Sequence, residues 1–192
     1  MGLNTSPLEF LQPVQELNRA FLGFVRSRAR RGLDCLELPA DVRTALCGAS
    51  NDLLDSVALF PHALFGLRFD AGQGNVLRDG SSSEKDASLR DMTLLVLYAA
   101  RSASRRSAFQ ARLLFGLDDG TLRQLRSLPL VELQRLSLAP GVLGCAFTDR
   151  DWLWQGLLTD GRPESLRRLV LVALQPGLAG DWPRRRAPLA VT

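Results

Sequence analysis

Apolar residues recur at helical spacing along most of this chain. In residues 14–31 they lie three or four positions apart, which places them on one face of a helix: Val14, Leu17, Phe21, Phe24 and Val25. Gly32 is expected to end this segment. Residues 87–106 show the same pattern at Leu89, Met92, Val96 and Ala100. Both segments are predicted to be long helices that bury one face.

Shorter helices account for most of the remaining sequence. Capping residues, Pro and Gly place them at about 40–47, from 51 to before 61, and at 108–115, 119–127, 130–137, 150–158 and 163–174. Residues 63–69 fit one more turn or an extended piece. Gly and Ser gather in 71–86, the predicted linker, and the tail from 176 is expected to be loosely ordered. The sequence therefore predicts an all-α protein.

An internal repeat organises these elements. The run Arg26–Arg31 matches Arg101–Arg106 at an offset of 75. From Leu38 onward the offset is 79, and it pairs Leu38 with Leu117, Leu46 with Leu125, Leu54 with Leu133 and Pro61 with Pro140. The difference corresponds to a four-residue insertion near Phe109. We therefore expect two repeats, 1–85 and 86–175, followed by a tail at 176–192.

Composition narrows the classes of function. The 192 residues are 46% apolar and 23% charged, with one histidine and three cysteines. These are globular values, and neither a signal peptide nor a membrane span is evident, so we expect a cytoplasmic protein that does not contact a membrane. One imidazole and an odd cysteine count argue against a metal site, a catalytic triad and a disulfide framework. The expected protein is not an enzyme and has no cofactor and no metal.

The positive charge is almost entirely arginine. Net charge is +4, and Lys85 is the only lysine among 24 basic residues. Arginine binds phosphate in a bidentate manner, so this surplus is compatible with nucleic-acid binding. The alternative is a GC-rich genome whose codons favour arginine, and +4 on this length does not demand an anionic partner.

Several apolar motifs resemble the FlhD family, the small all-helical subunit of the flagellar master transcriptional regulator. They are Leu94–Tyr98, Ala111–Leu117 and Leu125–Leu130 in the second half, and Leu17-Asn18 and Leu67–Asp70 in the first. The resemblance covers residues 14–85 and 90–174. An FlhD chain carries one copy of this unit and pairs with another chain. The resemblance therefore implies two FlhD-like repeats packed as an intramolecular pseudo-dimer.

The resemblance also implies a function. FlhD shares its DNA contacts with a zinc-binding partner, FlhC, and this chain has no zinc-ligand set of its own. A transcriptional regulator subunit that acts with an FlhC-like partner, and binds DNA with it, is the implied role. The alternative is a scaffold or accessory protein of a bacterial secretion or motility machine that does not bind DNA. The family's subunit-linking cysteine corresponds to Phe65 and Gly144, so no intersubunit disulfide follows.

Two groups of residues are candidate sites. The ends of the two long helices offer symmetric phosphate contacts: Arg26, Arg28, Arg30, Arg31, Arg101, Arg105 and Arg106. The alternative is that these cations stabilise the helix dipole. Large apolar side chains are candidates for packing between repeats or with a partner, because a 75-residue unit buries little surface alone: Leu17, Phe21, Phe24, Met92, Val96, Trp152 and Trp154.

The last two predicted helices resemble a helix–turn–helix. The second of them carries Leu169–Val172, which is too apolar for a helix that reads base edges. Packing or partner binding is therefore the favoured role of this region. Homo-oligomerisation is left open by the sequence.

Overall fold

A computed structural model describes residues 11–69, 84–148 and 150–159. The helices are α1 (Gln12–Arg30), α2 (Ala40–Gly48), α3 (Asn51–Ala58), α4 (Glu84–Arg106), α5 (Ala108–Phe115), α6 (Asp119–Ser127), α7 (Leu130–Leu138) and α8 (Asp151–Thr159). Two short strands, β1 (Phe65–Leu67) and β2 (Leu143–Cys145), pair antiparallel. The mostly helical class is confirmed. The predicted helix at 163–174, the tail and nearly all of the predicted linker lie outside the described residues.

Local chemistry explains where the short helices begin and end. The side chains of Ser50, Ser107 and Asp118 each accept a hydrogen bond from the backbone N–H three residues later, which caps α3, α5 and α6. Gly116 ends α5 in the left-handed region, at φ 63°, where a side chain would be strained. These caps set the short helices that pack against α1 and α4.

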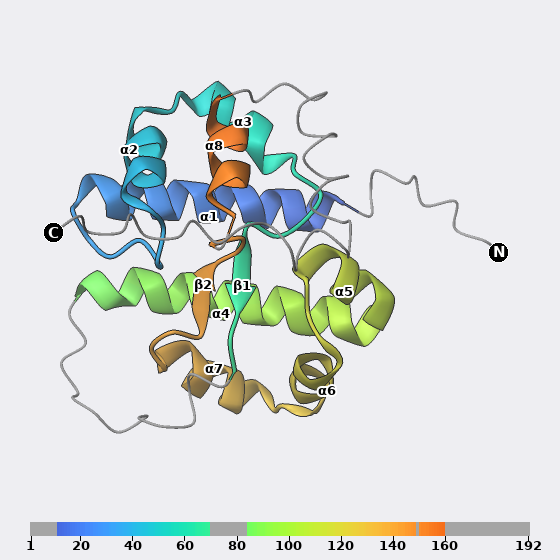
Figure 1. Cartoon of the computed structure of the whole chain (residues 1–192). Coiled ribbons are helices and arrows are strands. Elements are labelled where there is room, and N and C mark those ends of the chain that lie inside the picture. Colours follow the sequence, from blue (N-terminus) through green and yellow to red (C-terminus); the bar gives the residue numbers. More distant parts are fainter. Residues whose placement is uncertain (1–10, 70–83, 149, 160–192) are drawn as a thin grey trace, which may run out of the picture.

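The elements form two groups joined by the strand pair (Figure 1). α1 and α4 run across the molecule one above the other, with β1 and β2 crossing between them. α2 and α3 pack on α1, whereas α5, α6 and α7 pack on α4. The last described helix, α8, returns to the first group and contacts α2 and α3. The two halves of the chain are therefore interleaved.

One continuous hydrophobic core runs through both groups. The two long helices contribute the same buried pattern, with each position in α4 lying 75 residues after its equivalent in α1. The pairs are Leu17 and Met92, Asn18 and Thr93, Phe21 and Val96, Leu22 and Leu97, and Val25 and Ala100. α1 and α4 also contact each other. The predicted boundary at residue 85 thus divides a single core.

The strands refine the sequence expectations. Of the two options for residues 63–69, the extended one is correct, because β1 lies at their centre. The strand at 143–145 was not among the expected elements. A three-residue strand is too short to leave a period-two pattern, and its pairing partner lies 78 positions away in the sequence.

Candidate partner and nucleic-acid sites

The strand pair is symmetric about its central residues. Gly66 faces Gly144, with Phe65 opposite Cys145 and Leu67 opposite Leu143. Beyond each end, the backbone N–H of Arg68 donates to Val142 O at 2.9 Å, and that of Ala146 donates to Leu64 O at 3.0 Å. Adding 78 to Arg68 and Leu64 gives Ala146 and Val142. The second bond therefore repeats the first, as a local two-fold axis through the glycine pair requires.

A fully buried amide ties α1 to the start of β1. The Asn18 side chain is 0% exposed and donates from Nδ2 to Phe60 O at 3.0 Å and to His62 O at 2.8 Å. Its Oδ1 accepts from the backbone N–H of Leu64 at 2.9 Å. All three side-chain bonds go to the segment that leads into β1. Asn18, which the family resemblance marked only as part of a matching dipeptide, therefore fixes the strand against the long helix.

The arginines at the end of α1 bind backbone carbonyls. Arg30 Nη2 donates to Cys47 O at 3.1 Å and Arg26 Nη1 donates to Ala49 O at 3.3 Å, both near the end of α2. Arg28 is only 7% exposed, donates from Nε to Asp34 O at 2.6 Å and lies over the Phe24 ring. Arg31 is exposed. Within this cluster, Arg28 is thus the member least accessible to a phosphate.

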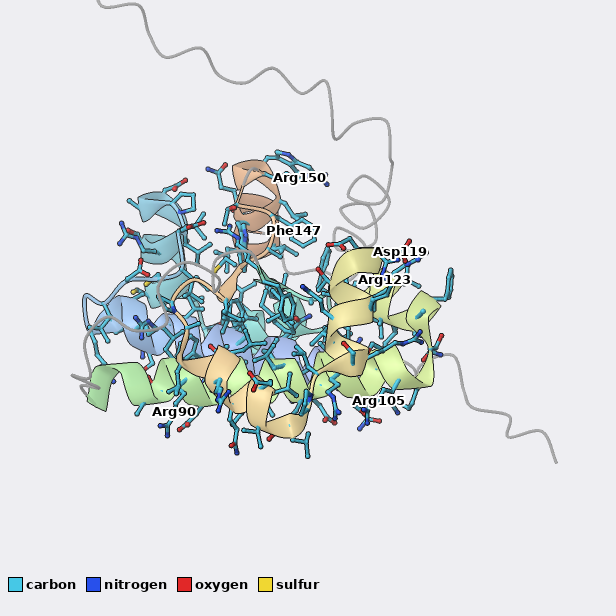
Figure 2. All side chains as sticks on the ribbon, turned by 90° about the horizontal axis from the view of Figure 1, so that it is seen from below. Arg90, Arg105, Asp119, Arg123, Phe147 and Arg150 are labelled. Atoms are coloured by element: carbon cyan, nitrogen blue, oxygen red, sulfur yellow. The ribbon has the colours of Figure 1, made fainter. Side chains whose placement is uncertain are left out.

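The end of α4 repeats one of these contacts. Arg105 (Figure 2) donates from Nη2 to Arg126 O at 3.3 Å, near the end of α6. In return, Arg126 Nε donates to Ser104 O at 2.7 Å. Arg101 has a buried Nε that finds no hydrogen-bond partner among the described residues, and Arg106 is exposed. Arg30 and Arg105 are exposed as well but bind carbonyls, whereas Arg31 and Arg106, also 75 positions apart, are exposed and their side chains make no hydrogen bond or ion pair with the described residues.

The predicted interface residues lie mainly in the internal core. Leu17, Phe21, Met92, Val96 and Trp154 are buried, so within the chain they are covered by its own residues. The remaining two, Phe24 and Trp152, are partly buried and pack against that core.

Two polar contacts fix α8, one to the chain just after β2 and one to α2 in the first half. Trp154 Nε1 donates to Ala146 O at 2.9 Å, just after β2. Gln155 Nε2 donates to Asp41 Oδ2 at 2.7 Å, on α2. The Asp41 contact also lowers the pKa of that carboxyl. Arg150 and Phe147, which stack on each other, mark the turn into α8 (Figure 2).

Among the hollows of the described surface, two lie beside the strand pair. The first, of about 550 Å³, lies between α5 and the strand pair and is lined mostly by apolar groups, including Phe65, Phe109 and Phe115. His62 is one of its lining residues. Burial lowers the pKa of this imidazole, and a hydrogen bond with the backbone of Leu113 opposes the shift. The rim residue Phe109 is 72% exposed.

The second hollow, of about 690 Å³, lies between α6 and the end of β1. It is lined by Leu67, Arg68, Phe69, Asp118, Gly120, Thr121, Arg123 and Gln124. We call it the α6 groove. Arg68 pairs with Glu37 at 2.9 Å, and this contact lowers the pKa of the Glu37 carboxyl. Sequence patterns gave no indication of this site, because its residues come from elements that only the fold brings together.

The outer surface of α7 is unusually apolar. Leu130, Val131 and Leu138 are each more than half exposed. Exposed apolar groups that cluster on one element are typical of binding surfaces. This surface was not among the predicted sites.

Cysteine and metal chemistry add no further site in the described part of the chain. Cys35, Cys47 and Cys145 are free thiols. The Cys145 thiol contacts Cys35 O at 3.7 Å, and burial raises its pKa. No group of three His, Cys, Asp or Glu side chains within the described ranges could hold a metal ion. Likewise, none of the helices seen there has the length and apolarity needed to cross a bilayer.

Comparison with known proteins gives no family assignment. No protein-family model, no curated protein and no solved structure matches the chain. The function must therefore be inferred from the residues and from their arrangement.

Proposed function

We propose that the chain is a tandem pair of FlhD-like repeats folded as an intramolecular pseudo-dimer, which acts as a regulator subunit through a protein partner. The observation that carries this proposal is the strand pair centred on Gly66 and Gly144, with its two equivalent flanking hydrogen bonds. Any antiparallel ladder has a local two-fold axis; what supports the proposal is that the axis here passes between residues from matching places in the two repeats, as two-fold related units would require. Here both units belong to one chain.

Matching contacts away from the strands support the same proposal. Arg30 in α1 donates to the carbonyl of Cys47 in α2, and Arg105 in α4 donates to the carbonyl of Arg126 in α6. The donors are 75 positions apart and the acceptors 79, which are the offsets of the sequence repeat. We call residues related by 75 (α1 and α4) or 79 (α2 and α6, α3 and α7) counterparts. Around the strands the pairing of Gly66 with Gly144 gives an offset of 78, one less than the 79 that the sequence match predicted for this segment, which paired Leu64 with Leu143.

The repeat offset changes from 75 to 79 in the segment where the two halves are linked differently. Residues 31–39 link α1 to α2, whereas the longer link from α4 to α6 contains α5. The four extra residues expected near Phe109 fall in this added helix. An insertion at a surface connection leaves the counterpart positions of the core in place.

The pseudo-dimer predicts a single unfolding unit. Leu46 and Leu125 are counterparts and both are 0% exposed. Leu46→Ala and Leu125→Ala should each lower the free energy of unfolding by about 2–5 kcal/mol. Both should do so in one and the same urea transition, followed by circular dichroism and by tryptophan fluorescence. Two separate transitions, each moved by only one of the variants, would show independent domains and overturn the pseudo-dimer.

The regulator role predicts DNA binding through the exposed cations. The chain should be titrated, alone and with any protein that co-purifies, against a duplex at two salt concentrations. Affinity should fall steeply with salt, and the double variant Arg31→Ala/Arg106→Ala should weaken it at low salt. Arg28→Lys, a change at the least accessible arginine, is the control.

A second function is favoured by the apolar surface of α7. If the chain is a scaffold of a secretion or motility machine, Leu130, Val131 and Leu138 would bind a protein and DNA would not bind. A chain that retains a stoichiometric protein partner, shows no salt-dependent DNA binding and loses the partner in Val131→Asp would establish this alternative and refute the DNA-binding role.

A further inference from the structure

We infer that the seam between α4 and α7 binds a segment of a partner protein that carries a carboxylate next to large aliphatic side chains. The inference rests on the proposed pseudo-dimer, because it compares this seam with the equivalent seam between α1 and α3. In each half the short helix packs on the long one, α3 on α1 and α7 on α4 (Figure 1). The comparison gives the chemistry of the partner that the apolar surface of α7 would bind.

Polar side chains close the seam on the first half. Arg26 on α1 donates from Nη2 to Asn51 Oδ1 at 2.9 Å, at the start of α3. One turn further along α3, Arg19 Nε pairs with Asp55 Oδ1 at 2.8 Å. Each arginine of α1 that faces α3 therefore has its acceptor within the chain.

The second half keeps one of these cations but has lost its acceptor. The counterpart of Asn51 is Leu130, whose side chain cannot accept a hydrogen bond. Arg101 is the counterpart of Arg26, and its buried Nε has no hydrogen-bond partner among the described residues. A buried donor without an acceptor costs free energy, which a ligand that supplies the acceptor recovers.

Aliphatic surface takes the place of the lost polar groups. Leu130, Val131 and Leu138 are 52%, 58% and 63% exposed, and their spacing places them on one side of α7. On α4, the half-buried Leu94 occupies the position that corresponds to Arg19. The seam thus combines an exposed aliphatic surface with a guanidinium that has no acceptor in the described part of the chain.

The acidic side chains described on α4 and α7 are Asp91 and Glu132, and neither pairs with Arg101. Glu132 follows Leu130 by two positions, which places it on the other side of α7, and it accepts from Arg135 Nη1 at 2.8 Å. Asp91 lies almost three turns away along α4 and pairs with the preceding arginine at 3.6 Å. A partner carboxylate therefore complements the guanidinium, and leucine-like side chains complement the surface of α7.

The probe is a capped, alanine-based helical peptide with two leucines at i and i+4 and a glutamate in the next turn. A second peptide has glutamine in place of the glutamate. Each is titrated into the isotope-labelled full chain and followed by NMR of the methyl groups and of the arginine Nε–H groups. We expect shifts of Leu130, Val131, Leu138 and the Arg101 Nε–H. The glutamate peptide should bind about two- to five-fold more tightly, as one ion pair with a partly exposed arginine allows.

Matched variants locate the binding. Arg101→Met keeps the length of the side chain but removes its charge, and it should abolish the advantage of the glutamate peptide. Arg26→Met makes the same change at the counterpart position and should leave both affinities unchanged. Leu130→Asn restores the acceptor that Asn51 provides on the first half, so it should weaken binding of both peptides and also abolish the advantage of glutamate.

Equal affinities of the two peptides, or no shifts on α7 at millimolar peptide, would overturn the inference. So would nuclear Overhauser contacts in the free chain from the Arg101 Nε–H to residues 70–83 or 160–192, because the chain would then cover the seam itself. A single urea transition beside any of these results would leave the pseudo-dimer standing. A stoichiometric partner that is still lost in Val131→Asp would leave the scaffold alternative standing.

Discussion

Asn18 offers the most direct test of how the strand pair is held. Its side chain is fully buried and makes hydrogen bonds to three backbone groups of the segment before β1, at 2.8–3.0 Å. Asn18→Ala removes all three partners at once. Buried backbone groups that lose their partners cost about 1–3 kcal/mol each, so the three together should cost roughly 3–9 kcal/mol.

The counterpart residue provides the control. Thr93 is also buried, but its Oγ1 donates to Leu89 O within its own helix, at 2.7 Å. Thr93→Val removes only this local bond and leaves the helical partner of Leu89 in place. We expect a cost of about 1 kcal/mol. The two variants thus separate a contact that links elements from one that does not.

The measurement is urea unfolding at equilibrium. All variants are fitted with one m value, the slope of the unfolding free energy against urea concentration. A domain of this kind has an unfolding free energy of about 5–15 kcal/mol, and the loss expected for Asn18→Ala is a large part of it. Asn18→Asp is the second variant: it keeps an acceptor for Leu64 N–H but places a carboxylate against the carbonyl oxygens of Phe60 and His62 in a fully buried site, so at neutral pH it should cost at least as much as Asn18→Ala. If Asn18→Ala costs no more than Thr93→Val, the proposed role of Asn18 in fixing β1 is refuted.

Three further predictions concern single residues. Arg30→Ala and Arg105→Ala should each lower stability by about 0.5–1.5 kcal/mol in urea unfolding, because each removes a bond to a carbonyl near the end of a neighbouring helix; unequal losses would contradict their equivalence. The imidazole of His62, the one histidine in the chain, should titrate by NMR below its usual pKa. Since its folded pKa is lowered, the stability it contributes is present above about pH 6.5 and is lost as pH falls through the folded pKa; a midpoint at or above 6.5 would refute its burial. Gly23→Ala, at an exposed mid-helix site with free space around it, should stabilise by about 0.5–1 kcal/mol, whereas Gly116→Ala, at φ 63°, should destabilise by about 1 kcal/mol. Thermal melts that gave both glycine variants the same sign would contradict these backbone assignments.

The helices could be read from the sequence because their signals are local. The prediction for 119–127 matches α6, since Asp118 caps its start. The prediction for 108–115 matches α5, which Ser107 and Gly116 delimit. α4 begins at Glu84, inside the predicted linker, because a charged first turn carries no apolar periodicity.

The strands and the position of α8 could not be read in this way. β1 and β2 have three residues each and exist because they pair across the two halves. α8 was expected at 150–158, but nothing in its own sequence indicates that it packs on α2 and α3. Long-range placement of this kind is determined by the shape of the whole core and not by periodicity.

The arginine runs that end α1 and α4 show how a sequence pattern can leave the role of its residues open. The sequence offered phosphate contacts or stabilisation of the arginines' own helix dipole. The structure provides a third role, in which Arg30 and Arg105 donate to carbonyls near the ends of α2 and α6. Only tertiary structure brings those carbonyls within reach. DNA contact remains a prediction, and Arg31 and Arg106 are the residues on which it is most directly tested.

Joining two repeats in one chain has a consequence for partner binding. In a homodimer both copies of a surface are identical by symmetry, so any partner site occurs twice. In a tandem chain the core must keep its counterparts, but each surface can change independently. Leu54 and Leu133 remain apolar and buried, whereas exposed Asn51 and Asp52 correspond to Leu130 and Val131. The exchange of Asp41 for Gly120 beneath α8 follows the same division. On the proposed pseudo-dimer, the first half is covered by α8, a helix of the second half, whereas the second half offers the apolar face of α7 to another protein. This asymmetry predicts one partner per chain, which the stoichiometry of the complex measures directly. Two partners per chain would mean that the halves had kept equivalent binding surfaces.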